Sequence, residues 1–154
     1  RPDNIKSLVY LTALLFENGQ VMKPVASREP DVVRRGLERD SWTVSSDLST
    51  ISFNENSVRD RFYNDCSDDD FAWARTMLVP QPSGPLMDPM KITAENYGRV
   101  PKVYIECEID GALWLPYQRE MQANVACDRT IIMNTGHSPF LSAPKELADH
   151  LMSI

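Results

Sequence analysis

Three segments of the chain are apolar almost without interruption. Ile5–Leu15 is the longest and ends at Glu17-Asn18-Gly19, while Lys102–Cys107 and Thr130–Met133 are shorter runs of the same kind. Continuous rather than alternating hydrophobicity is typical of strands that are covered on both faces, as in a parallel sheet. The pattern therefore predicts three parallel strands and an α/β fold.

Helical patterns connect and follow these strands. Pro116–Asn124 lies between the second and third strands and has a proline in its first turn, which favours a helix start. A strand–helix–strand unit of this kind forms a right-handed parallel crossover. Pro144–Met152 predicts a terminal helix after the third strand.

The middle of the chain has a different pattern. Pro30–Arg39, Ser57–Tyr63 and Ser67–Leu78 read as helices, and Ser67 is placed as an N-cap before acidic residues. The prolines of Val79–Pro85 argue against regular structure there. We expect a largely helical cap over the sheet, without two or more paired strands, from which Pro80–Pro89 returns the chain toward the core. Ordinary peripheral helices are the alternative.

These patterns divide the chain into residues 1–18 as a core strand, 19–98 as a cap insertion and 99–154 as the remaining core. The first strand is too apolar to be a bare edge, which would invite aggregation. We therefore expect it to pair with an N-terminal segment absent from this sequence, in the same chain or in a companion chain. Without that segment the chain is expected to be poorly soluble or oligomeric, for example a homodimer.

Composition narrows the classes of function. A net charge of −6 argues against a nucleic-acid-binding surface, which needs clustered Lys and Arg. The longest apolar run is far below the roughly 18 residues that cross a bilayer, so no membrane association is expected. Cys66, Cys107 and Cys127 are far apart, which predicts neither a disulfide framework nor a metal site and favours a cytoplasmic protein. We expect no cofactor.

An acid and a histidine each follow a predicted strand. Asp110 comes shortly after Lys102–Cys107, and His137 follows Thr130–Met133. Strand ends open onto the crevice of an α/β sheet, where a histidine is well placed for proton transfer. Glu106 and Glu108 compete with Asp110, although alternation puts both on one strand face while Asp110 lies at the exit. His137 taken alone could equally be an ordinary loop histidine.

With these residues in place, the chain resembles the C-terminal part of an α/β-hydrolase. The similar group is that of methylesterases, salicylate-binding esterases and hydroxynitrile lyases, in a bacterial-type member. Four stretches carry the resemblance: Leu8–Ala13 with Gly19, Phe62–Cys66, Pro101–Asp110 with Gln118, and Gly136–Ser142 with Pro144. No single stretch is specific, but together and in this order they are informative.

The resemblance implies a serine hydrolase of carboxylic esters. It places the acid of a Ser-Asp-His triad on Asp110 and the histidine on His137. The family's serine lies in a Gly-x-Ser-x-Gly elbow, and no serine of this sequence has glycines two residues to either side. The serine and the oxyanion hole would then belong to the absent N-terminal segment, and this chain alone would be inactive.

The same resemblance suggests residues for a substrate pocket and one competing reaction. The pocket candidates, for which packing alone is the alternative role, are Phe71, Trp73, Trp114 and Phe140, with Ser138 beside the histidine. The resemblance implies that a hydroxynitrile lyase of this group has a lysine directly after the histidine. This chain has Ser138 at that position. Ester hydrolysis is therefore the better interpretation.

Two hypotheses of other classes remain open. The chain could be a non-catalytic member of the fold that binds a small hydrophobic ligand, since one fold hosts many functions. It could also be a truncated product that acts as an interaction module through an exposed sheet edge.

Overall fold

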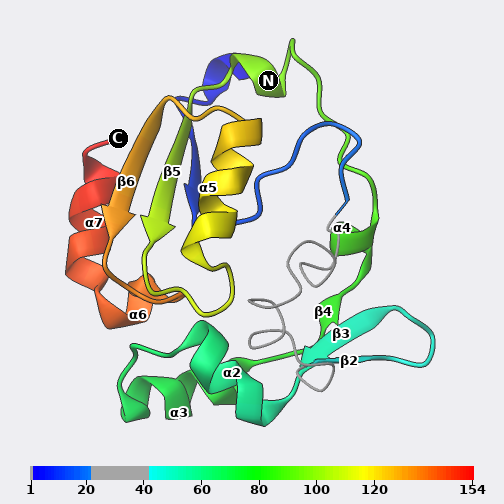
Figure 1. The fold of residues 1–154 in the computed structure, drawn as a ribbon, viewed down its shortest axis with the longest axis vertical. Coiled ribbons are helices and arrows are strands. Elements are labelled where there is room, and N and C mark those ends of the chain that lie inside the picture. Colours follow the sequence, from blue (N-terminus) through cyan, green and yellow to red (C-terminus); the bar gives the residue numbers. More distant parts are fainter. Residues whose placement is uncertain (1, 22–41) are drawn as a thin grey trace.

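A three-stranded parallel sheet lies at the centre of the core (Figure 1), in a computed structural model that describes residues 2–21 and 42–154. β1 (Leu8–Leu11), β5 (Lys102–Cys107) and β6 (Arg129–Met133) follow the spatial order β1-β5-β6. Leu8 pairs with Lys102, and Val103 pairs with Arg129. The short elements before and after these strands are η1 (Pro2–Asn4), η3 (Tyr97–Arg99) and α6 (Pro139–Ser142).

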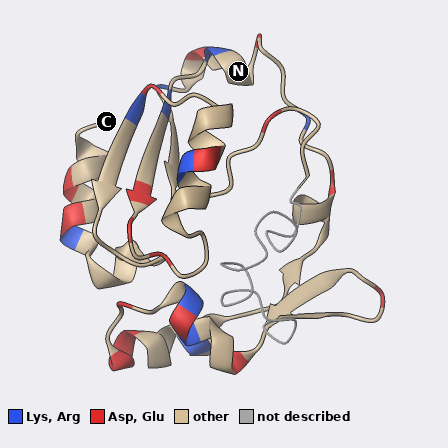
Figure 2. Ribbon diagram, viewed as in Figure 1, with Lys and Arg blue, Asp and Glu red and all other residues tan. Residues whose placement is uncertain are grey.

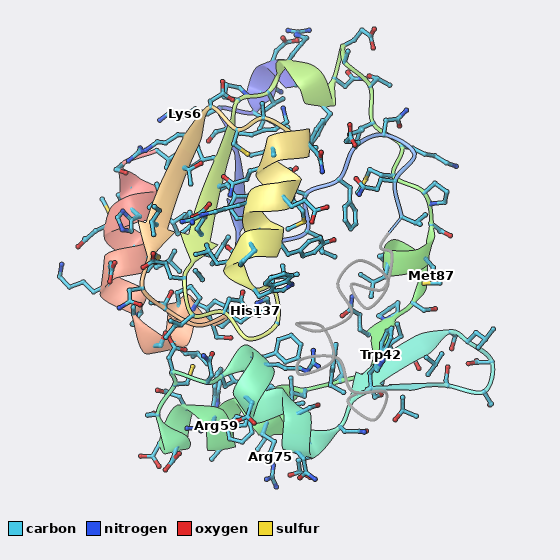
Figure 3. The ribbon with its side chains drawn as sticks, in the orientation of Figure 1. Lys6, Trp42, Arg59, Arg75, Met87 and His137 are labelled. Atoms are coloured by element: carbon cyan, nitrogen blue, oxygen red, sulfur yellow. The ribbon has the colours of Figure 1, made fainter. Side chains whose placement is uncertain are left out.

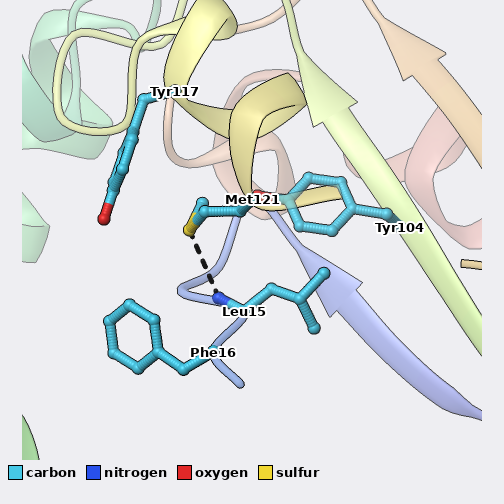
Figure 4. Packing of buried hydrophobic residues seen from close by; sticks show 5 residues of the cluster. All are labelled: Leu15, Phe16, Tyr104, Tyr117 and Met121. Atoms are coloured by element: carbon cyan, nitrogen blue, oxygen red, sulfur yellow. Dashed lines mark hydrogen bonds between the residues drawn. The ribbon is translucent and has the colours of Figure 1, made fainter. Parts of the chain in front are cut away.

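One helix covers each face of this sheet. α5 (Leu115–Asn124) packs on one face, and α7 (Pro144–Met152) on the other (Figure 1). β5 is buried along its whole length, so its side chains alternate between two apolar clusters. Tyr104 joins the cluster under α5, with Leu15, Phe16, Tyr117 and Met121 (Figure 4). Ile105 joins the cluster under α7, with Val103, Ile131, Met133 and Leu147.

The predictions for the core are confirmed, with one correction. β5, β6, α5 and α7 lie where the pattern placed them. β1 is shorter than Ile5–Leu15, because Thr12 has φ 34°, which no extended strand permits. Beyond that turn, Leu15 and Phe16 leave the sheet and pack against α5, so their hydrophobicity reflects the cluster rather than a longer strand.

The cap region combines helices with a second sheet of paired strands, so the prediction of a largely helical cap is wrong; we keep the name cap region for residues 19–98. β2 (Trp42–Val44), β3 (Thr50–Phe53) and β4 (Gln81–Pro82) form an antiparallel sheet that is separate from the core sheet. The helices of this region are α2 (Glu55–Phe62), α3 (Asp68–Met77) and α4 (Gly84–Met87). The predicted helix Pro30–Arg39 lies outside the described residues.

The proline-rich segment is also more regular than predicted. Gln81 and Pro82 pair with Ile51 and Thr50, which is tolerated because β4 is an edge strand of its sheet. After α4, Met90 exchanges backbone hydrogen bonds of 2.8 and 2.9 Å with Gly19 and Gln20. The segment thus does bring the chain back to the residues that follow β1, as expected.

Caps and charges fit the helices. The Ser67 side chain accepts a hydrogen bond from the Asp70 amide at 3.1 Å, which confirms the predicted N-cap of α3. Basic and acidic residues occur together on α2, α5 and α7 (Figure 2). Within residues 2–21 and 42–154, none of the helices combines the length and apolarity of a membrane span.

Candidate active site

The loops that leave β5 and β6 run side by side at the end of the sheet that faces α2 (Figure 1). The Glu108 amide donates to the Met133 carbonyl at 2.9 Å, and the Ile109 amide donates to the Thr135 carbonyl at 3.2 Å. The pairing of the two strands therefore continues into their loops. This continuation brings the next residues, Asp110 and His137, to the same place.

Asp110 and His137 form a hydrogen-bonded pair. His137 Nδ1 lies 2.8 Å from Asp110 Oδ2, which confirms the predicted reach between the two side chains. The carboxylate is fully buried, whereas the imidazole is 25% exposed and lies between the strand ends and α2 (Figure 3). A proton on Nδ1 leaves the lone pair on Nε2, the tautomer that a general base requires.

The buried carboxylate is held by three further donors. Asp110 Oδ1 accepts hydrogen bonds from the amides of Ala112 at 2.6 Å and Leu113 at 2.9 Å. The Thr12 hydroxyl donates to Oδ2, the oxygen that His137 also contacts. With its donors supplied from three directions, the carboxylate has one orientation available, and it fixes the plane of the imidazole.

Thr12 reaches this position at a conformational cost. Its φ of 34° is rare for a β-branched residue and ends β1. Strained backbone of this kind persists only where its surroundings hold it, and it clusters at functional sites. Thr12 lay in one of the stretches that carried the family resemblance, but sequence reasoning gave it no role. Its signal was a polar residue at the end of an apolar strand.

An aromatic ring from the cap region packs on the histidine. The Phe62 ring meets the His137 ring edge-on, with 5.1 Å between centroids, and Phe53 packs on Phe62 with 4.8 Å between centroids. Phe62 was not among the predicted pocket residues. Phe62 is the last residue of α2, and its contact with His137 could be found only from the fold.

The aromatic pocket candidates are dispersed. On α3, Phe71 packs on Tyr63 and under the Arg59 guanidinium, while Trp73 is 61% exposed. Trp114 packs beside the cluster under α5, and Phe140 is 54% exposed. These contacts join none of the four to the Asp110–His137 pair, and their contact with a substrate stays a prediction.

Ser138 and the competing acids have clear positions. Ser138 is buried, and its carbonyl accepts hydrogen bonds that start α6. Glu106 is buried and binds Arg119 at 3.1 Å and Gln122 at 2.8 Å, so it links β5 to α5. Glu108 is exposed. Of the three acids considered, Asp110 is the one that contacts the histidine.

The cysteines are unsuited to nucleophilic chemistry. All three are free, and burial raises the pKa of Cys66 and of Cys107 to about 11. Their thiols stay protonated near neutral pH, and the thiol is a weak nucleophile. Within the described part of the chain, no group of three or more His, Cys, Asp or Glu side chains is arranged to hold a metal ion.

The chain is similar to known proteins over nearly its whole length. A model of the "Alpha/beta hydrolase family" matches residues 3–150. Methyl jasmonate esterase 1 of Vitis vinifera is 30% identical over 99% of the chain, and putative methylesterase 14, chloroplastic, of Arabidopsis thaliana is 24% identical over the same share. The chain spans 62% and 46% of the lengths of these two relatives.

Solved structures agree with this match. The crystal structure of a pyrethroid hydrolase from Sphingobium faniae JZ-2 superposes with a TM-score of 0.80 at 21% identity, over 99% of this chain and 61% of that one. At this identity the likeness concerns the fold. The parallel sheet with its covering helices is therefore the fold that the resemblance implied.

Proposed function

The chain belongs to the alpha/beta hydrolase family, and from that premise we propose that it is the part of a serine-type carboxylic ester hydrolase that supplies the acid and the histidine. The observation that carries the proposal is the 2.8 Å hydrogen bond between buried Asp110 and partly exposed His137 at the exits of adjacent parallel strands. The two named relatives, a methyl jasmonate esterase and a protein named as a putative methylesterase, support the same reaction.

The proposed reaction needs a serine that this sequence does not provide in the elbow motif. The serine hydroxyl attacks the ester carbonyl while His137 Nε2 takes its proton. Asp110 holds the Nδ1 tautomer and stabilises the imidazolium that forms. His137 then gives the proton to the leaving alcohol, and the acyl-enzyme is hydrolysed when His137 deprotonates a water molecule.

We place that serine on an N-terminal segment that pairs with β1. In the described residues β1 is an edge strand, and Val9 in its middle is exposed. An unpaired apolar edge is a site of aggregation, which a neighbouring strand removes. The chain spans only part of its relatives, which leaves room for such a segment. Below, the complete protein means this chain together with that segment, in one chain or two.

The test is ester hydrolysis by the complete protein. We expect it to hydrolyse p-nitrophenyl acetate and simple methyl esters, the second class being suggested by the names of the relatives. His137→Ala should lower kcat/KM by about 10³-fold or more, because only the oxyanion hole and binding then remain. His150→Ala is the matched control, since His150 lies on α7 beside Glu146.

Two outcomes would contradict the proposal. One is strong hydrolysis by residues 1–154 alone, which would mean that the nucleophile lies within this chain. The other is a folded complete protein that binds esters without hydrolysing them, which would favour the ligand-binding alternative.

A further inference from the structure

The connection between α2 and α3 touches the loops of both Asp110 and His137. This connection, residues 63–67, and the end of α2 before it, residues 60–62, belong to the cap region, and the two loops belong to the core. Phe62 contacts the His137 ring itself, as described above. The other contacts fall on the backbone immediately beside Asp110 and His137, and they are polar.

Two neighbouring side chains, Asn64 and Asp65, make one hydrogen bond to each loop. Asn64 Nδ2 donates to the carbonyl of Ile109 at 2.8 Å. Asp65 Oδ2 accepts from the amide of Gly136 at 2.6 Å. Ile109 directly precedes Asp110, and Gly136 directly precedes His137. We call Asn64 and Asp65 the clasp.

The loops approach this connection too closely for side chains. A Cβ at Gly136 would overlap the side-chain oxygens of both clasp residues, and a Cβ at Gly111 would overlap the carbonyl oxygen of Asp60. Glycine at these two positions permits the close backbone approach. The cap region therefore packs closely against the residue after Asp110, which is Gly111, and against the residue before His137, which is Gly136.

The clasp acts where the pairing between the two loops ends. Backbone hydrogen bonds join the loops as far as Ile109 and Thr135. Asn64 binds Ile109 at that last paired position, and Asp65 binds Gly136, the residue that follows Thr135. One connection thus holds both loops at adjacent residues, Ile109 and Gly136.

We propose that Asn64 and Asp65 are positioning residues that set the separation and orientation of Asp110 and His137. The proposal rests on the ester hydrolysis proposed above, since it concerns the same pair. Small displacements of a catalytic group have large effects, with about 10²-fold in rate for a misplacement of about 1 Å. Positioning shells of this kind act through hydrogen bonds to the groups that carry the reacting side chains.

Two pairs of variants of the complete protein test the proposal with p-nitrophenyl acetate. Asp65→Ala removes the acceptor for Gly136 and should lower kcat by about 10- to 100-fold with little change in KM. Asp65→Asn keeps a carbonyl oxygen in place and should restore most of the rate. Asn64→Asp keeps the shape but sets a carboxylate against the Ile109 carbonyl, so it should be at least as damaging as Asn64→Ala.

Asp69→Ala is the matched control. Asp69 lies in the first turn of α3, is exposed, and is four residues from Asp65. Its removal changes the charge of the cap by the same amount without touching either loop. We expect kcat and KM of this variant to equal those of the unmodified protein.

Two measurements without substrate separate this proposal from the proposed function. The Gly136 amide should exchange with solvent faster in Asp65→Ala than in Asp65→Asn. The downfield proton resonance of His137 Nδ1 should shift or broaden in Asp65→Ala and Asn64→Asp. If the complete protein hydrolyses no ester, these two readouts still decide whether the clasp positions the pair.

The proposal is overturned if Asp65→Ala leaves both kcat and the Nδ1 resonance unchanged. It is also overturned if Asp65→Ala and Asp65→Asn lose activity equally while both remain folded. In that case the charge of Asp65, rather than its hydrogen bond to Gly136, would matter.

Discussion

The core sheet and the cap sheet differ in how much of their side-chain surface is buried. In the core sheet every residue of β5 is buried, and helices cover both faces. In the cap sheet the strands are two to four residues long, and Ile51 is their one buried residue in the described part of the chain. Large apolar side chains such as Trp73, Met77 and Leu48 are exposed on the cap region. Burial of apolar area therefore stabilises the core far more than the cap.

This difference assigns separate tasks to the two regions. The core supplies Asp110 and His137, because parallel strands bring their carboxyl ends to one edge. The cap supplies Phe62 and the clasp, which meet the pair from outside the sheet. A weakly buried region that contacts a rigid pair can adjust without unfolding the pair.

The largest expected effect lies in the core. Asp110→Asn in the complete protein should lower kcat on the order of 10⁴-fold, because an amide favours the wrong imidazole tautomer. Circular dichroism and a thermal melt provide the folding control. An Asp110→Asn protein that is folded and nearly fully active would remove the pair from the reaction and, with it, the division of tasks.

Burial in the two sheets can be compared directly by the same substitution. Ile105→Ala should lower the free energy of unfolding of the complete protein by about 2–5 kcal/mol, since the Ile105 side chain on β5 is fully buried in the cluster under α7. Ile51→Ala in β3 should cost less, because its short sheet collapses more easily around the lost methyls. Denaturant titration measures both. Equal losses would contradict the contrast between the sheets.

The sequence predicted the core elements well where a strand is buried on both of its faces. Lys102–Cys107 and Pro144–Met152 were placed at their observed bounds, because continuous hydrophobicity and the proline start are local signals. The strands Trp42–Val44 and Gln81–Pro82 are too short, at three and two residues, to show an alternation of apolar and polar positions in the sequence. Their strand state depends on pairing with β3, which is a tertiary property.

The site divides in the same way. Asp110 and His137 were found because each follows an apolar strand. Thr12, Phe62 and the clasp were not assigned, although all lay in the stretches that carried the resemblance. Their roles arise from contacts between residues 45 to 98 positions apart, which spacing along the chain does not reveal.

Thr12 offers a smaller test of how much the core alone holds the acid. Thr12→Val keeps the branched shape but removes the hydroxyl that donates to Asp110 Oδ2. The free energy of unfolding of the complete protein should fall by about 1–3 kcal/mol, with a drop in kcat of roughly tenfold. Thr12→Ser retains the hydroxyl and is the control. If both variants lose activity equally, the φ of 34° rather than the hydrogen bond is what matters.

The smallest expected effect concerns pH and Cys107. Burial raises the pKa of this thiol from 9.0 to about 11, so between these values the unfolded chain releases a proton that the folded protein keeps. The stability contribution is complete below pH 9 and is lost as pH rises toward 11. Cys107→Ala should therefore show a shallower fall in unfolding free energy from pH 9 to pH 11.

The matching thiol on the cap side sharpens the comparison. Burial also raises the pKa of Cys66 to about 11, but Cys66 lies on the α2–α3 connection, whereas Cys107 lies inside β5. Cys66→Ala should change the alkaline slope by a similar amount, because the slope depends on the pKa and not on the region. Labelling by a thiol reagent at pH 8 should differ, with Cys66 reacting before Cys107, because the cap side opens at a lower free energy than the core. Labelling of Cys107 first would mean that the central strand is the less stable region, and the contrast between core and cap would then have to be reversed.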